Sequence, residues 1–303
     1  SLYIVAAPAL AQTAYPARNV QIIVPYTPGG SIDIMTRSVA MQLAQAWGKN
    51  VVVDNRPGAG GMIGTEIAAR SAPDGYTLVQ GHIGTHASPQ FLYKRMGYDP
   101  LKDFAPVALF GTSPYLFVVH PGVPVKTMTE FIDYARARPG QLTAGTAGGN
   151  SAFLAVEMLR SMAKIDVLNI PYKGAGPAAI DVLAGQIPLY FMNALQAVPH
   201  IKGGRLRALA VTSEKRFPTL PYIPTIAESG VPGYAMSNWY GLLVQGGTPR
   251  DTINKLQQET ARILNLPELK ERLAGEGMTV VASTPEQFVE FLARETAKFN
   301  RII

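Results

Sequence analysis

The sequence predicts an α/β protein in which parallel strands alternate with covering helices. Short apolar, β-rich runs are each followed by a turn and then by apolar residues at helical spacing, which is the pattern of β-turn-α units. The chain has 303 residues, which is the length of about two ordinary domains. Hydrophobic residues make up 47% and charged residues 16%, which is enough for packed cores and excludes a disordered chain.

The first third of the chain establishes the repeating order. An apolar run at 20–25 predicts a strand, and the turn 27–31 follows it. Apolar residues at helical spacing from Ile32 to Trp47 predict a helix that ends at Gly48. The order then repeats with a strand at 51–53, a glycine-rich loop at 55–61, a helix at 63–69 and a strand at 76–79.

The middle of the chain keeps this order, and the end is helical. Thr127 and Glu130 have the spacing of a capping box at the start of a helix. Thr248 and Thr284 are each followed by proline, which predicts the starts of two terminal helices. A stretch rich in Pro and Gly, 218–233, precedes this tail and favours a middle domain inserted into the first one. Further strands are predicted at 116–119, 142–145, 167–172, 189–192 and 206–212.

Charge and cysteine content narrow the possible functions. The 27 Lys and Arg against 21 Asp and Glu give a net charge of +6, but no run of five like charges occurs. Nucleic-acid binders usually cluster their basic residues, so we expect no nucleic-acid partner and only a weak preference for small anions. The chain has no cysteine, which excludes thiol catalysis, disulfides and thiolate metal sites.

An apolar segment opens the sequence. Residues 2–11 end in Ala9-Leu10-Ala11, an A-x-A cleavage pattern, so we expect 1–11 to be the remnant of a signal peptide. The mature protein would then begin near Gln12. The alternative is a buried N-terminal strand. No other stretch reaches 18 uninterrupted apolar residues, and the sequence predicts no transmembrane span.

Two patterns typical of enzymes are incomplete. Gly58, Gly60 and Gly64 lie between a strand and a helix, but the next strand lacks the terminal acidic residue that a dinucleotide ribose requires. We therefore expect no cofactor. The segment 149–153 departs at one position from the G-x-S-x-G nucleophile elbow. A secreted serine hydrolase that uses Ser151 and a histidine remains the alternative function.

The histidines form no recognisable metal-binding pattern. His82 and His86 are four residues apart, but they lie among glycines rather than on a helix. Neither a carboxylate pair nor an H-E-x-x-H pattern accompanies them, so we expect no metal site.

Three glycine-rich turns lead directly into helices, at 27–33, 147–151 and 173–177. Each leaves free backbone N–H groups at a helix N-terminus, where the helix dipole favours an anion. In a parallel-sheet protein such turns gather at the carboxyl ends of the strands, where α/β folds bind ligands. The turns therefore predict a site for a carboxylate ligand, and the alternative is that they are plain connections.

The sequence resembles the periplasmic solute-binding proteins of tripartite tricarboxylate transporters, the Bug-type receptors. The resemblance extends in order from about residue 15 to the end. Its segments are 22–33 (IIVPYTPGGSID), 55–64 (NRPGAGGMIG), 73–78 (PDGYTL), 171–174 (PYKG), 199–202 (PHIK), 206–212 (LRALAVT) and 239–242 (WYGL).

The resemblance implies a two-lobed periplasmic binding protein fold (Venus flytrap, type II), in which each lobe is a mostly parallel sheet flanked by helices. It places 12–112 and 235–303 in the first lobe and 113–234 in the second, with crossings near 111–115 and 229–234. It also implies a monomeric, non-catalytic periplasmic receptor that binds a small organic carboxylate between the lobes and delivers it to membrane permease subunits.

The resemblance further implies a set of ligand-binding residues. In the first lobe they are Tyr26, Thr27, Gly29, Gly30, Asp33, Thr85 and His86, and in the second Ala147, Gly148, Asn150, Ser151, Tyr172, Lys173, Gly174 and Asn193. The chain departs from the family in Phe191-Met192-Asn193, where Phe-Asp-Asn is frequent, and in His86, where small residues are common.

The side chains expected near the cleft indicate a ligand class. Their rings and thioether favour a dicarboxylate with an aromatic or medium-length apolar middle, such as terephthalate. The alternative is that several of these side chains face the core. They are Tyr26, His86, Phe153, Tyr172 and Met192.

Overall fold

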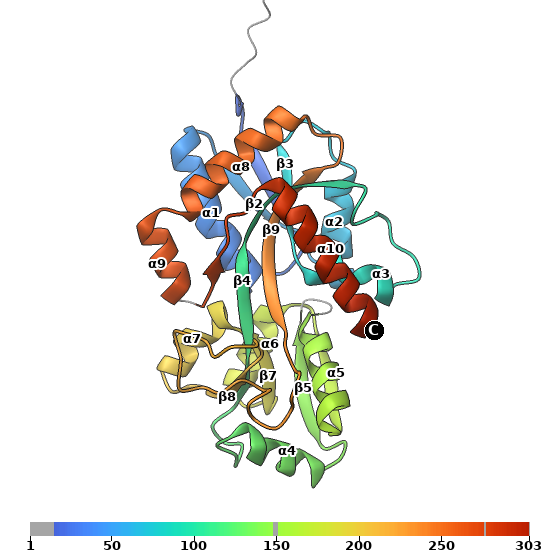
Figure 1. Cartoon of the computed structure of the whole chain (residues 1–303), viewed down its shortest axis with the longest axis vertical. Helices are drawn as coiled ribbons and strands as arrows, with labels where there is room; N and C mark the ends of the chain where they lie inside the picture. Colours follow the sequence, from blue (N-terminus) through green and yellow to red (C-terminus); the bar gives the residue numbers. More distant parts are fainter. Residues whose placement is uncertain (1–14, 148–150, 276, 303) are drawn as a thin grey trace, which may run out of the picture.

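The computed structural model describes residues 15–147, 151–275 and 277–302. Two lobes lie one above the other and are connected by two long strands, β4 (Phe104–Val119) and β9 (Ser237–Gln245) (Figure 1). The predicted signal-peptide remnant lies outside the described residues. This is the two-lobed α/β architecture that the sequence predicts.

The first lobe, at the top of Figure 1, is built from both ends of the chain. Its strands are β1 (Val20–Val24), β2 (Val51–Asn55), β3 (Thr77–Gly81) and the short β10 (Thr279–Val280). Its helices are α1 (Ser31–Trp47), α2 (Met62–Ala69), α3 (Pro89–Leu92), α8 (Arg250–Leu264), α9 (Pro267–Gly275) and α10 (Pro285–Ile302). A 3-10 turn, η1 (Ala59–Gly61), and a π-helical turn, η2 (Ile83–Ala87), complete it.

The second lobe comes from the middle of the chain (Figure 1). Its strands are β5 (Leu142–Ala147), β6 (Val167–Tyr172), β7 (Leu189–Asn193) and β8 (Arg207–Val211). Its helices are α4 (Met128–Arg136), α5 (Ser151–Ala163), α6 (Ala175–Leu183) and α7 (Ala194–Lys202).

The strand order places the crossing strands at the centre of the molecule. It runs β2-β1-β3-β9-β4 through the first lobe and β4-β7-β5-β6 through the second, where β8 also pairs with β4. The predicted β-turn-α strands pair in parallel, β1 with β2 and β3, and β5 with β6 and β7. The crossing strands are antiparallel to their neighbours, because β4 leaves the first lobe and β9 returns to it.

Strand β4 is much longer than the strand predicted at 116–119. Its residues 104–114 pair with β9, and residues 115–119 pair with β7 and β8. The return occurs at Ser237, which pairs with Pro114. The segment 229–234 precedes that point, and the Tyr234 hydroxyl donates to the carbonyl of Ala155 in α5 at 2.9 Å.

Helix ends follow the capping residues that the sequence contains. Helix α1 begins after Gly30 and ends at Gly48, whose φ of 61° is the left-handed conformation that glycine adopts readily. At α4, Thr127 accepts from the backbone N–H of Glu130. At α10, Thr284 and Gln287 accept each other's backbone N–H groups, which is a reciprocal capping box.

Aromatic packing fixes α10 against the crossing strand β9. The Trp239 ring lies edge-on to Phe288 at 5.7 Å and to Phe291 at 5.8 Å between ring centroids. A Cβ at Gly241 would overlap the Phe288 ring, so this close approach requires glycine. Trp239 and Tyr240 are therefore core residues of the first lobe rather than cavity residues.

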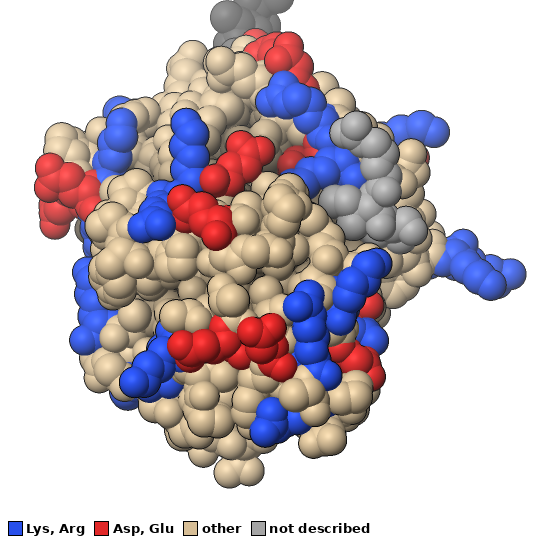
Figure 2. Space-filling view, turned by 60° about the horizontal axis from the view of Figure 1, so that its bottom comes forward, with Lys and Arg blue, Asp and Glu red and all other residues tan. Residues whose placement is uncertain are grey.

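On the face drawn in Figure 2, Lys and Arg lie interspersed with Asp and Glu. The ion pairs of the described residues include Arg160 with Glu157 and with Asp166. In the part of the chain that the structure describes, no helix is both long and apolar enough to cross a membrane.

Candidate functional site

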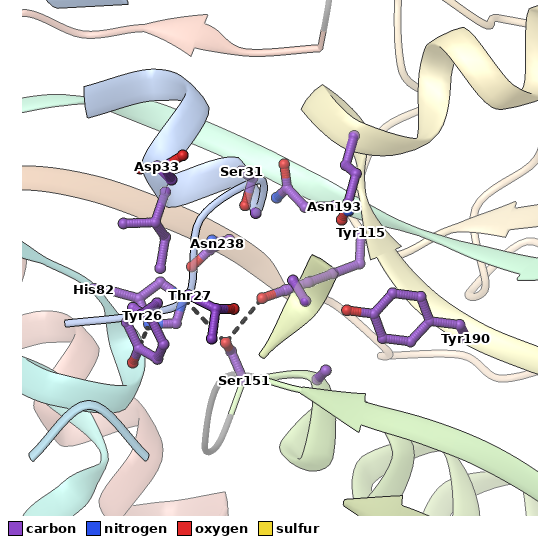
Figure 3. Close-up of a pocket in the computed structure, with 15 residues that line it drawn as sticks. Tyr26, Thr27, Ser31, Asp33, His82, Tyr115, Ser151, Tyr190, Asn193 and Asn238 are labelled. Carbon is purple, nitrogen blue, oxygen red and sulfur yellow. Dashed lines mark hydrogen bonds between the residues drawn. The ribbon is translucent and has the colours of Figure 1, made fainter. Parts of the chain in front are cut away.

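A cavity of about 30 Å³, partly open to solvent, lies where the two lobes meet (Figure 3). In this closed form it has room for about one or two water-sized groups, such as one carboxylate, and not for a whole small molecule, whose sites measure about 300–1,000 Å³. The first lobe supplies Tyr26, Thr27, Gly30, Ser31, Ile32, Asp33 and His82. The crossing strands supply Tyr115 and Asn238, and the second lobe supplies Ser151, Ala152, Ala175, Tyr190, Asn193 and Gln196.

Four helices begin at this cavity. Gly30 and Ser31 are at the start of α1, Ser151 of α5, Ala175 of α6 and Asn193 of α7. Neither Gly30 nor Gly174, the residue before α6, has a side chain that could cap its helix. The first backbone N–H groups of α1 and α6 therefore have no side-chain cap and can bind an anion, whereas at α7 the Asn193 side-chain oxygen already accepts from the Leu195 N–H.

Asp33 is a carboxylate of the cavity lining whose oxygens are already used. It accepts hydrogen bonds from the Gly29 N–H, the Arg37 guanidinium and the Asn55 amide, each at about 3.0 Å. Burial raises the pKa of the Asp33 carboxyl, but these hydrogen bonds outweigh burial and hold the pKa below its ordinary value. Asp33 therefore fixes the turn before α1. No Lys or Arg is among the described residues that line the cavity.

A chain of hydrogen bonds crosses the cavity from one lobe to the other (Figure 3). The Tyr26 hydroxyl lies 3.2 Å from His82 Nδ1, and His82 Nε2 lies 3.0 Å from the Ser151 hydroxyl oxygen. The Tyr115 hydroxyl lies 2.8 Å from the same Ser151 oxygen. Each of these four side chains is buried, with at most 6% of its surface exposed.

The backbone determines which nitrogen of His82 carries the proton. The N–H of Gly84 donates to Nδ1 at 3.1 Å, so Nδ1 is an acceptor. Burial, and to a lesser degree the nearby His86, lowers the pKa of His82 to about 3, so the ring is neutral near pH 7. A neutral imidazole has one N–H, which is therefore on Nε2 and donates to Ser151.

A second, larger hollow adjoins the cavity and shares Tyr26 and Thr27 with it. It has a volume of about 430 Å³ and lies between the glycine-rich loop 57–61 and the pair Tyr172 and Lys173. The Tyr172 hydroxyl donates to the Asp181 carboxylate at 2.6 Å. Lys173 is the one cation among the described residues that line this hollow.

The lobes touch around the cavity, as in a closed receptor. A Cβ at Gly174 would overlap the Thr27 hydroxyl oxygen of the other lobe, and a Cβ at Gly30 would lie 3.2 Å from that of Ala175. The backbone of Gly174 is extended, with φ of 177° and ψ of 174°, which any residue can adopt. The glycine at position 174 therefore reflects the close approach of the two lobes.

The structure brings six of the predicted ligand-binding residues to the cavity and places others elsewhere. Tyr172 and Lys173 line its mouth, and Gly29 and Gly174 belong to the turns that surround it. Ala147 ends β5, where it pairs with Tyr172, and Gly148 and Asn150 lie outside the described residues. The six are Tyr26, Thr27, Gly30, Asp33, Ser151 and Asn193.

Thr85 and His86 are buried in the first lobe and do not line the cavity. The His86 ring packs edge-on against Phe104 at 4.8 Å, and its Nδ1 lies 2.8 Å from the Thr85 hydroxyl. Burial lowers the pKa of His86 to about 3. Neither side chain is among the residues that line the cavity or the adjoining hollow, which the four-residue spacing from His82 does not reveal.

The ring-rich cleft predicted from sequence has different members. Met192 is buried in the core of the second lobe, and Phe153 is half-exposed on α5, where it lines a separate surface groove. The rings that border the cavity are Tyr26, Tyr115 and Tyr190. Within β7, Tyr190 and Asn193 reach the cavity, whereas Met192 packs into the core of the second lobe.

Sequence reasoning missed several lining residues. His82 directly follows β3, a central strand, but the four-residue spacing that makes it visible in the sequence is a feature of metal sites and does not indicate this position. Tyr115 and Asn238 lie on the crossing strands, where no local pattern signals a site. No group of three or more His, Asp or Glu side chains among the described residues could hold a metal ion.

The chain matches known proteins over nearly its whole length. A family described as the tripartite tricarboxylate transporter family receptor matches residues 35–303. The protein BugT of Bordetella pertussis is 37% identical over 306 residues, which is 99% of this chain and 92% of that protein.

Solved structures agree with this similarity. An R. palustris protein solved with adipate is 34% identical, with a TM-score of 0.92 over 95% of this chain and 97% of that one. The protein MatC from Rhodopseudomonas palustris, with bound malate, is 30% identical, with a TM-score of 0.90 over 95% of this chain and 99% of that one. The periplasmic binding protein BugD is 33% identical, with a TM-score of 0.90 over 95% and 97% of the two chains.

Proposed function

Because the chain belongs to the tripartite tricarboxylate transporter receptor family and is a periplasmic solute-binding receptor, we propose that it binds a small dicarboxylate between its lobes. One carboxylate occupies the inner cavity, and the other lies toward the mouth, near Lys173. The relatives solved with adipate and with malate support this ligand class.

The observation that carries the proposal is the convergence of four helix N-termini on a cavity whose described lining residues include no cation. A micromolar affinity corresponds to about −8 kcal/mol. Each N-terminus contributes about 0.3–1 kcal/mol at an exposed site and up to about 2 kcal/mol where partly buried. The termini alone reach that affinity only at the upper limit, so charge-assisted hydrogen bonds from hydroxyls such as Thr27 and Ser151 must contribute as well.

The proton arrangement argues against the serine hydrolase. A nucleophilic serine needs a histidine nitrogen that accepts its proton, and a carboxylate that accepts from the other nitrogen. Here His82 donates to Ser151 and accepts from a backbone N–H, which is the reverse arrangement. We therefore propose a receptor without catalytic activity.

The remaining parts of the proposal follow from the family. The receptor acts as a monomer, is exported with a signal peptide that ends near residue 11, and delivers its ligand to membrane permease subunits. The lobes divide at 12–112 with 235–303 and at 113–234, so that a ligand bridging them favours the closed form.

The walls of the cavity define the two candidate ligands. Tyr26, Tyr115 and Tyr190 offer ring surface to the middle of the ligand. A flexible six-carbon chain, as in adipate, and a flat ring, as in terephthalate, both place apolar surface between two carboxylates. We place adipate first because of the relative solved with it and terephthalate second.

Calorimetry of the mature protein with adipate, terephthalate, malate and citrate tests the proposal. We expect adipate or terephthalate to bind at least tenfold more tightly than citrate, which is about 1.4 kcal/mol. Mass spectrometry of each mixture after incubation should return every ligand unchanged. Tenfold tighter citrate, or no binding of any dicarboxylate, contradicts the proposed ligand class.

A hydrolase assay on carboxylate esters is the matching control. We expect no turnover by the wild-type protein. Ester turnover by the wild type that disappears in Ser151→Ala would contradict the receptor function and support the serine hydrolase instead.

A further inference from the structure

We propose that His82 is a positioning residue for ligand specificity: its Nε2–H makes the Ser151–Tyr115 hydroxyl pair donate a hydrogen bond to the ligand. This inference rests on the proposed dicarboxylate site and specifies which kind of ligand atom the hydroxyl pair can bind. Three buried side chains, His82, Ser151 and Tyr115, share a limited number of protons.

The two hydroxyls hold two protons. One of them forms the bond between the Tyr115 and Ser151 oxygens, which are 2.8 Å apart, whichever of the two donates. His82 Nε2 occupies a lone pair of Ser151 from the other side, at 3.0 Å. One hydroxyl proton of the pair is therefore left without a partner in this chain of bonds, and both hydroxyls belong to the cavity lining (Figure 3).

The other tautomer of His82 would remove this donor. If Nε2 accepted, Ser151 would give its proton to His82, and Tyr115 would give its proton to Ser151, so none would be left for a ligand. The Gly84 N–H prevents this because it already donates to Nδ1. The Gly84 N–H of η2 thus determines, through the His82 tautomer, whether the Ser151 and Tyr115 hydroxyls can donate a hydrogen bond to the ligand.

The consequence is a requirement for lone pairs at this end of the ligand. A carboxylate oxygen supplies them, whereas a group that presents only protons leaves the remaining hydroxyl proton unpaired and is disfavoured. Thr27 extends this requirement, because its hydroxyl oxygen has no hydrogen-bond partner among the described residues and also lines the cavity. The site therefore selects an anion through neutral donors.

Two substitutions of His82 separate its two hydrogen bonds. In His82→Gln the amide nitrogen can take the place of Nε2–H and donate to Ser151, while the contact to Gly84 is lost. In His82→Asn the amide oxygen can take the place of Nδ1 and accept from Gly84, but it does not reach Ser151. The pair has the same amide chemistry and differs in which bond survives.

Adipate affinity at pH 7 is measured by calorimetry for the wild type, both variants and Ser151→Ala, with melting curves for each. We expect His82→Gln to stay within about threefold of the wild type, and His82→Asn to bind at least tenfold more weakly, close to Ser151→Ala. If His82→Asn instead bound adipate more tightly than His82→Gln, the role of His82 would be limited to its hydrogen bond with the Gly84 N–H, and the proposal would be wrong. Equal affinities for the two variants, strong or weak, would also overturn the proposal, since affinity would then not depend on the Nε2 proton.

Nitrogen NMR of the ligand-free protein provides a readout that does not depend on the ligand. We expect the His82 ring to show a protonated Nε2 and an unprotonated Nδ1 between pH 6 and 8. A protonated Nδ1 overturns the proposal. If the wild type binds no dicarboxylate while the Nε2–H tautomer is found, the proposed function fails and the tautomer assignment stands.

Discussion

At the scale of single residues, the first lobe contains two neutral imidazoles with different tasks. His82 reaches the cavity and bonds across it, whereas His86 packs against Phe104 inside the lobe. Burial lowers the pKa of each ring to about 3. Since an unfolded histidine has a pKa of about 6.5, acid favours the unfolded chain, which takes up protons that the folded chain does not.

We expect stability to fall with pH from about 6.5 downward. Between the unfolded and folded pKa values each ring costs about 1.4 kcal/mol of unfolding free energy per pH unit. For the two rings together the loss between pH 6.5 and pH 5 is about 3 kcal/mol. Urea unfolding at pH 7.5, 6.5, 5.5 and 5.0 measures it.

His86→Leu should remove about half of this pH dependence, because one of the two buried rings no longer titrates. His120→Asn is the matched control: His120 lies in a half-buried turn, where its Nδ1 accepts from the Gly122 N–H, and an Asn oxygen can replace that acceptor. If the free energy of unfolding of His86→Leu depended on pH as steeply as that of the wild type, the loss of stability in acid would not come from the buried rings.

The sequence identifies some site residues and conceals others for a physical reason. Thr27, Gly30 and Ser151 stand at the starts of helices, where a glycine-rich turn is visible in the sequence itself. His82 and Tyr115 act through contacts with Ser151 that join positions 69 and 36 residues away. Only the closed arrangement of the lobes brings these partners together, and no local pattern encodes it.

At the scale of elements, the β-turn-α units are predictable and the crossing strands are less so. Hydrophobic periodicity predicts α1 and α5 nearly where they lie, because each helix has a buried and an exposed face. Strand β1 lies at a short apolar run before a turn and is buried along almost its whole length. Strand β4 is buried along most of its 16 residues and contains Pro106 and Pro114, so neither alternation nor uninterrupted apolar sequence marks its length.

The turn before α6 supplies a test of how closely the lobes approach. Gly174→Ala places a methyl group where the Thr27 hydroxyl lies in the closed form, while its extended backbone accepts alanine. We expect adipate to bind at least tenfold more weakly, a loss of about 1.4 kcal/mol, because the closed form becomes crowded. Calorimetry measures the affinity, and the melting temperature without ligand should hardly change.

Gly275→Ala, at the end of α9, is the control, since a Cβ there meets no atom within 4 Å. Its adipate affinity should equal that of the wild type. Wild-type affinity in Gly174→Ala would show that ligand binding does not need the contact between Thr27 and the α6 turn.

At the scale of the whole molecule, β4 and β9 connect the two lobes, and we expect the lobes to move about them. The two strands pair from Phe104 with Gln245 to Pro114 with Ser237, with two register shifts, so the connection is a two-stranded ribbon rather than a pair of loose linkers. We expect the ribbon to bend where β4 changes partners, between residues 114 and 115.

Small-angle X-ray scattering tests this motion. Saturating adipate should lower the radius of gyration of the mature protein, because the contacts of Gly30 with Ala175 and of Thr27 with Gly174 exist only when the lobes meet. In Gly174→Ala the decrease should be smaller at the same adipate concentration. A radius that adipate leaves unchanged in the wild type would contradict closure in solution.

Helix N-termini attract a ligand carboxylate over a shorter distance than a charged side chain does. The field of a helix terminus fades within about one turn, whereas a full cation acts over a Debye length of about 8 Å at physiological salt. Because the described lining residues include no cation, the proposed inner carboxylate would be held by short-range forces. We therefore expect a parting of the lobes by a few ångströms to release it almost completely, so that a membrane partner that only loosened the closed form would empty the receptor without a competing charge of its own.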